Sequence, residues 1–191
     1  YHPALFTDRN FYGVIKVYDA KLPSKKESED TALSARFMRH GTTMHGFQIL
    51  DKKLETAPTS YYTSDGPLGG IFSALRPKSV AVAGLGTGTV NCAVPRGADV
   101  TFFEIDPAVV EMAQEKFTFL SKCNSRSPRL VTGDARLEIA KITDKKFDLI
   151  LLDAFSSDMV PTHLLTKEAM ELSRQRLSSR GVIVFHISNR Y

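Results

Sequence analysis

Three glycines separated by single residues follow a run of small apolar residues. Residues 79–83 predict a buried strand, and Gly84, Gly86, Thr87 and Gly88 lie in the loop directly after it. Glycine lets a backbone turn tightly and approach a ligand closely, so a strand that leads into such a loop is typical of nucleotide sites. Dinucleotide sites use the spacing G-x-G-x-x-G. The tighter G-x-G-x-G here is typical of enzymes that bind S-adenosylmethionine or its decarboxylated form.

Acidic side chains stand at the end of a second apolar strand. Glu104 and Asp106 close this strand, about twenty residues after the first glycine, where an acid accepts hydrogen bonds from ribose hydroxyls. Asp106 also precedes Pro107 and is therefore a candidate helix N-cap. A strand-to-helix turn that binds nothing is the alternative for the whole pattern.

Further acids follow two later strands. In a parallel sheet, ligands bind beyond the carboxyl ends of the strands. We expect Glu104 to accept from both ribose hydroxyls, and Asp134, after Gly133, to accept from an adenine amino group. Asp153 should face whatever lies beyond the nucleoside. A helix cap or a loop-stabilising acid is the alternative for Asp153.

The histidines and serines suggest no other chemistry. His40 and His45 lie in a predicted hairpin without a nearby acid or cysteine to complete a metal site, so we expect no metal. His163 and His186 are expected to be structural. Ser156 and its neighbour do not lie in a nucleophile elbow, so hydrolysis is not indicated.

The predicted elements divide the chain at about residue 66. Residues 1–66 predict an N-terminal β-hairpin domain, with a strand at 11–18, a polar mobile loop at 20–35 and a strand, glycine turn and strand at 36–50. After a helix at 67–75, strands and helices alternate. Strands are predicted at 79–83, 100–105, 129–132, 147–153 and 181–188, and helices after Pro107, at 137–142 and, capped by Thr166, at 166–177.

This alternation predicts an α/β fold. Residues 67–191 should form a Rossmann-like catalytic domain of the S-adenosylmethionine-dependent methyltransferase type, whose parallel sheet is covered by helices on both faces. The chain starts with Tyr1 and stops three residues after the last predicted strand. We therefore expect a fragment or a processed form whose C-terminal end is incomplete.

Composition is that of a soluble globular protein. The 191 residues are 42% hydrophobic and 24% charged, without a run long enough to span a membrane. The net charge of +4 comes from scattered basic pairs such as Lys25–Lys26, so nucleic-acid binding is not expected. Cys92 and Cys123 lie in different predicted elements, and we expect free thiols in a reducing compartment.

The motifs together resemble a known family over nearly the whole chain. They include His40-Gly41, Gly46-Phe47-Gln48, Tyr61-Tyr62, the glycine loop, Glu104-Ile105-Asp106, Gly133-Asp134, and Asp153 with Ser156-Ser157-Asp158 and Pro161. This set is similar to the spermidine synthase (polyamine aminopropyltransferase) family. It is closest to the bacterial spermidine synthase-like group, some of whose members are fused to membrane segments.

The resemblance implies roles for individual residues. Glu104 belongs to a motif similar to the family's ribose-binding motif, and Asp134 to one similar to its adenine-binding motif. Asp153 matches the carboxylate that accepts a proton from the attacking amine. Gln48 and Tyr62 match positions that line the nucleoside and polyamine pockets.

Two positions depart from the family's pattern. Thr87 stands where the family carries an aspartate that holds the amino group of the aminopropyl arm. The family's Asp-Ser-Ser-Asp-Pro gate is stretched here between Asp153 and Asp158, which moves the acid expected to bind the substrate. The resemblance therefore predicts the fold of this chain more directly than it predicts the substrate.

The resemblance implies transfer of an aminopropyl group from decarboxylated S-adenosylmethionine to a di- or polyamine, in a cytoplasmic homodimer or in the cytoplasmic part of a membrane-associated protein. A methyltransferase that uses S-adenosylmethionine is one alternative, because Thr87 would not repel a cofactor that keeps its carboxylate. A non-catalytic nucleoside-binding module of a larger protein is the other.

Overall fold

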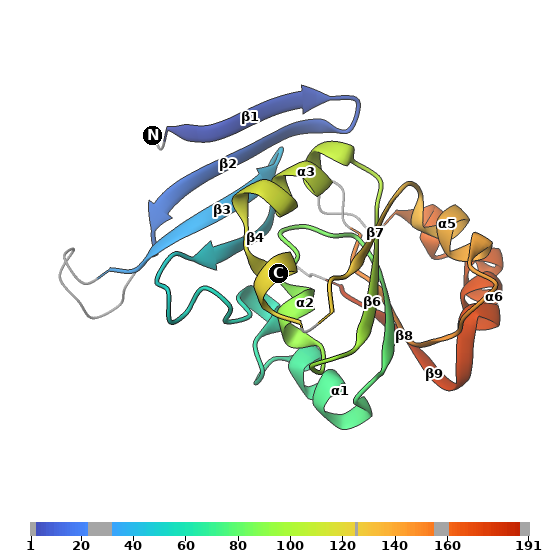
Figure 1. The fold of residues 1–191 in the computed structure, drawn as a ribbon. Coiled ribbons are helices and arrows are strands. Elements are labelled where there is room, and N and C mark those ends of the chain that lie inside the picture. The colour runs from blue at the N-terminus through green and yellow to red at the C-terminus, as the bar shows by residue number, and fades with distance from the viewer. Residues whose placement is uncertain (1–2, 23–31, 125, 155–160, 188–191) are drawn as a thin grey trace.

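Alternating side chains and tight turns build an antiparallel sheet at the N-terminus. The computed structural model describes residues 3–22, 32–124, 126–154 and 161–187 (Figure 1). The strands of this sheet pair in chain order: β1 (Ala4–Asn10), β2 (Gly13–Lys21), β3 (Ser34–His40) and β4 (Thr43–Ile49). Gly41 adopts a φ of 59° in the turn that joins β3 to β4, as the sequence predicts.

The strand predicted at 11–18 is wrong in its position. Phe11 and Tyr12 form the turn between β1 and β2, and Phe11 is 95% exposed. The side chain of Asn10 accepts a hydrogen bond from the Tyr12 amide, and Gly13 follows at a φ of 134°, which together close the turn. Most of the loop predicted at 20–35 lies outside the described residues.

The C-terminal part forms the predicted parallel sheet. Its strands are β5 (Ser79–Ala83), β6 (Asp99–Glu104), β7 (Arg129–Thr132), β8 (Phe147–Leu152) and β9 (Leu177–Phe185), in the order β7-β6-β5-β8-β9. All four strand pairs are parallel. The last strand starts earlier than predicted, since pairing with β8 begins at Leu177 and resumes at Val182 after an irregularity.

Helices cover both faces of this sheet. They are α1 (Pro67–Leu75), α2 (Val90–Ala93), α3 (Pro107–Lys116), α4 (Phe119–Lys122), α5 (Ala135–Lys141) and α6 (Lys167–Arg176), with 3-10 turns η2 (Ser60–Tyr62) and η3 (Thr162–Leu164). Figure 1 shows α5 and α6 on the side of the parallel sheet away from β1–β4. As predicted, Thr166 caps α6, and its side chain accepts from the Ala169 amide.

The alternation of side chains along the central strand separates two apolar clusters. Val80 and Val82 lie in the cluster that also contains Ile15 and Val17 of β2 and Met112 of α3. The next residues along β5, Ala81 and Ala83, lie in the cluster formed with α5 and α6. One core therefore joins the antiparallel sheet to the parallel one, and the domain boundary at residue 66 stays a prediction. Across the described ranges, no helix is long and apolar enough to cross a membrane.

The expectation of free thiols is wrong. Cys92 on α2 and Cys123, directly after α4, form a disulfide with Cα atoms 4.7 Å apart. The two cysteines lie in different elements, but these elements are neighbours in the fold. Helices α2 and α4 pack together, and the Asn91 side-chain amide donates to the Phe119 carbonyl at 2.9 Å.

Removing this disulfide should destabilise the protein. The bridge closes a loop with a sequence separation of 31. Chain-entropy arguments give a loss of about 3–4 kcal/mol for a loop of this size. We expect the double variant Cys92→Ala/Cys123→Ala to lose this free energy in urea denaturation. Detection of two reactive thiols in the denatured, unreduced protein would contradict the bridge.

His45 lies where the N-terminal sheet approaches the glycine loop. It lies on β4, and its carbonyl lies 2.7 Å from where a Cβ on Gly86 would be. Burial, together with the nearby His40, lowers the pKa of His45 from 6.5 to about 4. Between about pH 4 and pH 6.5, His45 is therefore neutral in the folded protein but protonated in the unfolded chain.

This shift predicts acid sensitivity. Because the folded pKa lies below the unfolded one, the stabilisation is complete above pH 6.5 and is lost as the pH falls towards 4. A shift of this size corresponds to roughly 3 kcal/mol. Urea denaturation should give a lower free energy of unfolding at pH 4.5 than at pH 7, and this difference should be smaller in His45→Gln. An unchanged pH slope in this variant would refute the assignment.

Candidate active site

The glycine loop fits closely among protein neighbours. Gly84, Gly86 and Gly88 all adopt positive φ values, 98°, 52° and 85°. A Cβ on Gly84 would lie 2.5 Å from the Asp153 carbonyl, and one on Gly88 would lie 2.8 Å from a methyl of Leu120. These glycines are therefore required by the local backbone and by packing, and they bring the loop next to the end of β8.

The Glu104 carboxylate joins two loops at the carboxyl edge of the sheet. Its Oε2 accepts from the Leu85 amide at 2.9 Å, and its Oε1 accepts from the Asp106 amide at 3.0 Å. Burial raises the pKa of Glu104, while these amide hydrogen bonds oppose the rise. The Ile105 amide also interacts with this carboxylate, and its remaining acceptor capacity is open to further donors.

Asp106 has the capping role considered as its alternative. Its Oδ1 accepts from the Ala108 amide at the start of α3 and from the Asn10 side chain of β1. Its Oδ2 lies 3.9 Å from Nε2 of His40. Asp106 is 1% exposed, so it fixes α3 against the N-terminal sheet rather than facing a ligand.

Asp134 also caps a helix. Its Oδ1 accepts from the amides of Arg136 and Leu137 at the start of α5. Its other oxygen lies 3.1 Å from Nε2 of His163. Gly133, the preceding residue, donates its amide to the Glu104 carbonyl, so Asp134 follows β7 at the same edge as Glu104.

Gln48 of β4 and Thr87 of the glycine loop are both buried. Gln48 donates to the Glu55 carbonyl and to Oγ1 of Thr118, and its own oxygen accepts from the Thr118 amide. Thr87 is 1% exposed and hydrogen-bonds Thr89. Thr87 packs against Gly46, where an added Cβ would lie 2.8 Å from Oγ1 of Thr87. An aspartate in place of Thr87 would therefore have a buried charge.

Asp153 is held from two sides at the end of β8. The Tyr62 hydroxyl forms a hydrogen bond with Oδ2, and Nδ1 of His186 lies 2.6 Å from Oδ1. The Tyr61 ring packs on the His186 ring with centroids 3.9 Å apart. These contacts fix the orientation of the carboxylate.

The two tyrosines stay neutral, and Tyr62 is the one that donates to Asp153. Burial, with the charge of Asp153, raises the pKa of Tyr61 to about 12 and the pKa of Tyr62 well above its usual value. Both hydroxyls therefore stay protonated at neutral pH. The Tyr62 donor and the Asp153 acceptor come from η2 and from the end of β8, 91 residues apart in the chain.

His186 was expected to be structural, and the sequence analysis missed its place beside Asp153. It follows β9, which is the neighbour of β8 in the sheet, so its position after a parallel strand was the available signal. Asp158 and Ser156–Ser157 lie outside the described residues. Within the described ranges, no three histidine, cysteine or acidic side chains group as metal ligands.

Comparison with curated proteins gives two relatives. The chain is 38% identical over 122 residues to a polyamine aminopropyltransferase of Vibrio vulnificus, covering 61% of this chain and 40% of the relative. It is 26% identical over 159 residues to a probable polyamine aminopropyl transferase of Bifidobacterium longum, covering 82% of this chain and 34% of the relative. The chain thus spans about two fifths or less of the length of these relatives. No protein-family model matches it.

Solved structures share the fold. Spermidine synthase from Thermotoga maritima aligns with a TM-score of 0.60 and 17% identity, over 94% of this chain and 55% of its own. A probable spermidine synthase from Corynebacterium glutamicum gives a TM-score of 0.68 and 16% identity, over 96% of this chain and 63% of its own. The Rossmann-like parallel sheet with a small N-terminal antiparallel sheet is therefore confirmed, as is the resemblance to the spermidine synthase-like family.

Proposed function

We propose that the chain contains the nucleoside-binding and catalytic part of an aminopropyltransferase. It would transfer an aminopropyl group from decarboxylated S-adenosylmethionine to a di- or polyamine. The observation that carries the proposal is the position of Asp153, held by Tyr62 beside Gly84 of the glycine loop. The named activity of the curated relatives supports the same reaction class.

The nucleoside would bind along the edge formed by the glycine loop. The remaining acceptor capacity of the Glu104 carboxylate suits the adjacent hydroxyls of a ribose. Asp134 would accept from the adenine amino group, with His163 competing for the same carboxylate. Gln48 would contribute indirectly, because its hydrogen bonds hold Thr118 and the segment 50–59 in place.

The amine would bind beside Asp153. A neutral amine nitrogen attacks the methylene next to the sulfonium; the C–N bond forms, and the C–S bond breaks to release methylthioadenosine. The amine proton passes to the Asp153 carboxylate, which Tyr62 and His186 hold in one orientation. Alignment and proton removal are the two contributions that the protein makes. We propose Asp158 as a further attraction for the cationic acceptor.

Methyl transfer is the second candidate, and Thr87 is the observation that favours it. A threonine at this position offers no charge to hold the ammonium group of an aminopropyl arm. It also does not repel the carboxylate of S-adenosylmethionine. Thr87 is buried, so it does not by itself decide between the two cofactor forms. The choice also depends on the other side chains that line the site of the cofactor's aminopropyl or aminocarboxypropyl arm.

Replacing Glu104 should weaken nucleoside binding. Loss of a charged acceptor for two hydroxyls costs about 1.5–3 kcal/mol, so methylthioadenosine should bind Glu104→Gln roughly ten- to a hundredfold less tightly. Isothermal titration calorimetry measures the affinity, and the exposed Glu111 of α3 gives the matched control Glu111→Gln. Equal affinities for Glu104→Gln and the unmodified protein would locate the nucleoside elsewhere.

Replacing Asp153 should affect turnover rather than binding. Asp153→Asn keeps the side-chain shape but removes the proton acceptor, so turnover should fall about a hundredfold or more while methylthioadenosine affinity changes little. The exposed Asp144 provides the control Asp144→Asn, which should retain full turnover. If Asp153→Asn keeps its turnover, this carboxylate is not the base.

A further inference from the structure

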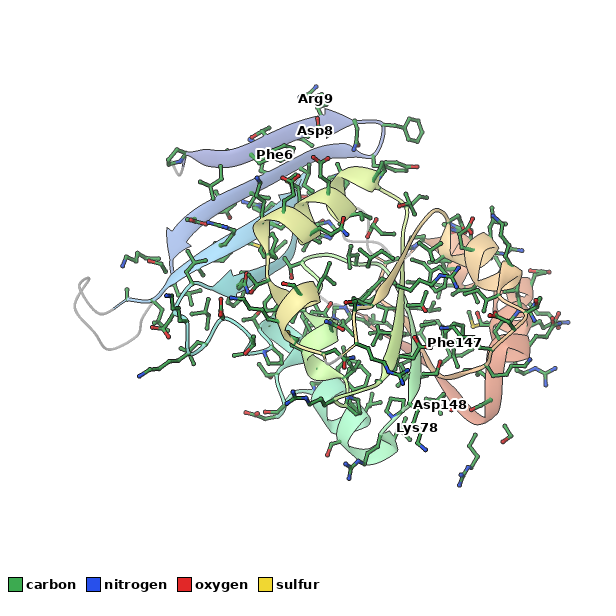
Figure 2. The ribbon with its side chains drawn as sticks, viewed as in Figure 1. Phe6, Asp8, Arg9, Lys78, Phe147 and Asp148 are labelled. Atoms are coloured by element: carbon green, nitrogen blue, oxygen red, sulfur yellow. A yellow bond between two sulfur atoms is a disulfide. The ribbon has the colours of Figure 1, made fainter. Side chains whose placement is uncertain are left out.

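A cavity lined by four cations lies at the amino edge of the parallel sheet. Its volume is about 460 Å³, and its charged lining consists of Arg76, Lys78, Arg96 and Arg126. None of its lining residues is acidic. Figure 2 shows Lys78 at the end of the molecule opposite Arg9 of β1.

Loops from different parts of the chain build this cavity. Arg76 and Lys78 connect α1 to β5, and Arg96 lies in the turn before β6. Asn124 joins the segment of Arg126 to that turn, because its oxygen accepts from the Gly97 amide at 2.8 Å and its amide donates to the Ala98 carbonyl at 2.9 Å. The arginines are therefore brought together by fixed backbone segments.

Asp148 lies beside Lys78: the Lys78 backbone amide donates to its Oδ2 at 2.9 Å, and the two side chains interact electrostatically, whereas the three arginines have no such partner within the described ranges. Among the described residues, no acidic oxygen lies within 4 Å of these four cationic groups. The whole chain carries 25 Lys and Arg against 21 Asp and Glu, so this cavity holds as many cations as the entire formal excess. Like charges that converge on one concave surface produce a positive potential that attracts anions.

The backbone at Arg76 supports a ligand-binding role. Arg76 is the C-cap of α1 with φ 45° and ψ 54°, in the left-handed region where glycine is the favoured residue. A non-glycine residue in this region is strained, and such strain is common where a side chain is needed for function. Here the strained residue, Arg76, is one of the residues that line the cavity.

We propose that this cavity binds a compact, multiply charged phosphate compound of the pyrophosphate class. Guanidinium groups match phosphate oxygens with two parallel hydrogen bonds, and three of the four cations are arginines. The volume lies within the range of small-ligand pockets. The five residues of β5 separate this edge from the glycine loop by about 17 Å. The site is therefore independent of the proposed transfer reaction.

Calorimetry with inorganic pyrophosphate at fixed ionic strength tests this site. We expect Arg96→Gln and Arg126→Gln each to weaken binding tenfold or more, because each removes a charge-assisted contact. The exposed Arg9, on β1, gives the matched control Arg9→Gln, which should bind pyrophosphate like the unmodified protein. Methylthioadenosine affinity should be unchanged in all three variants.

Arg76→Gly separates ligand binding from folding. Glycine relieves the left-handed strain, so this variant should melt at a higher temperature than the unmodified protein without ligand, yet bind pyrophosphate more weakly. Absence of pyrophosphate binding by the unmodified protein would overturn the proposal. Equal weakening of pyrophosphate binding by Arg9→Gln would also overturn it. So would an RNA oligomer that binds more tightly than pyrophosphate and whose binding is weakened to the same extent by every one of these variants. Both results would indicate diffuse electrostatic attraction instead of a defined site.

Discussion

The hydrogen bonds to the buried Glu104 carboxylate hold the carboxyl edge of the sheet together. One oxygen binds the first turn of the glycine loop at Leu85, and the other binds the turn before α3 at Asp106. A buried charge is costly unless it is hydrogen-bonded, so both loops must keep the conformations that supply these amides. The strand below adds a further constraint, since Gly84 donates its amide to the Phe103 carbonyl. The edge at which we propose that the nucleoside binds is thus formed by the fold itself.

The second half of this edge depends on a contact between distant parts of the chain. Tyr62 reaches Asp153 from η2, which follows the antiparallel sheet, while His186 reaches it from the end of β9. The N-terminal sheet therefore does more than cover the core: it leads into the segment that orients the carboxylate. The amino edge of the parallel sheet carries the arginine-lined cavity, alongside Asp99 and Asp148 at the starts of β6 and β8.

Local signals predicted the parallel sheet well. The apolar run of β5, the glycines after it and the acid that ends β6 are all properties of short segments, and they predicted these strands and the loop after β5. A separate local signal predicted the cap at Thr166. The turn at Phe11–Tyr12 was missed because aromatic residues favour strands, whereas the Asn10 side chain and Gly13 decide this turn.

Features that depend on tertiary packing could not be predicted in the same way. The Cys92–Cys123 bridge requires α2 and α4 to lie together, and the His186–Asp153 pair requires β9 to follow β8 in the sheet. The burial of Gln48 and Thr87 likewise follows from the position of the N-terminal sheet over the glycine loop. Except for the position of His186 after a parallel strand, residue type and spacing carry no signal for these contacts.

The most direct test of the account compares the two cofactor forms on the full protein that carries this chain. Calorimetry should show tighter binding of decarboxylated S-adenosylmethionine than of S-adenosylmethionine, and mass spectrometry after incubation with di- and polyamines should detect methylthioadenosine. Tighter binding of S-adenosylmethionine, with S-adenosylhomocysteine as the product, would contradict the account and assign methyl transfer instead.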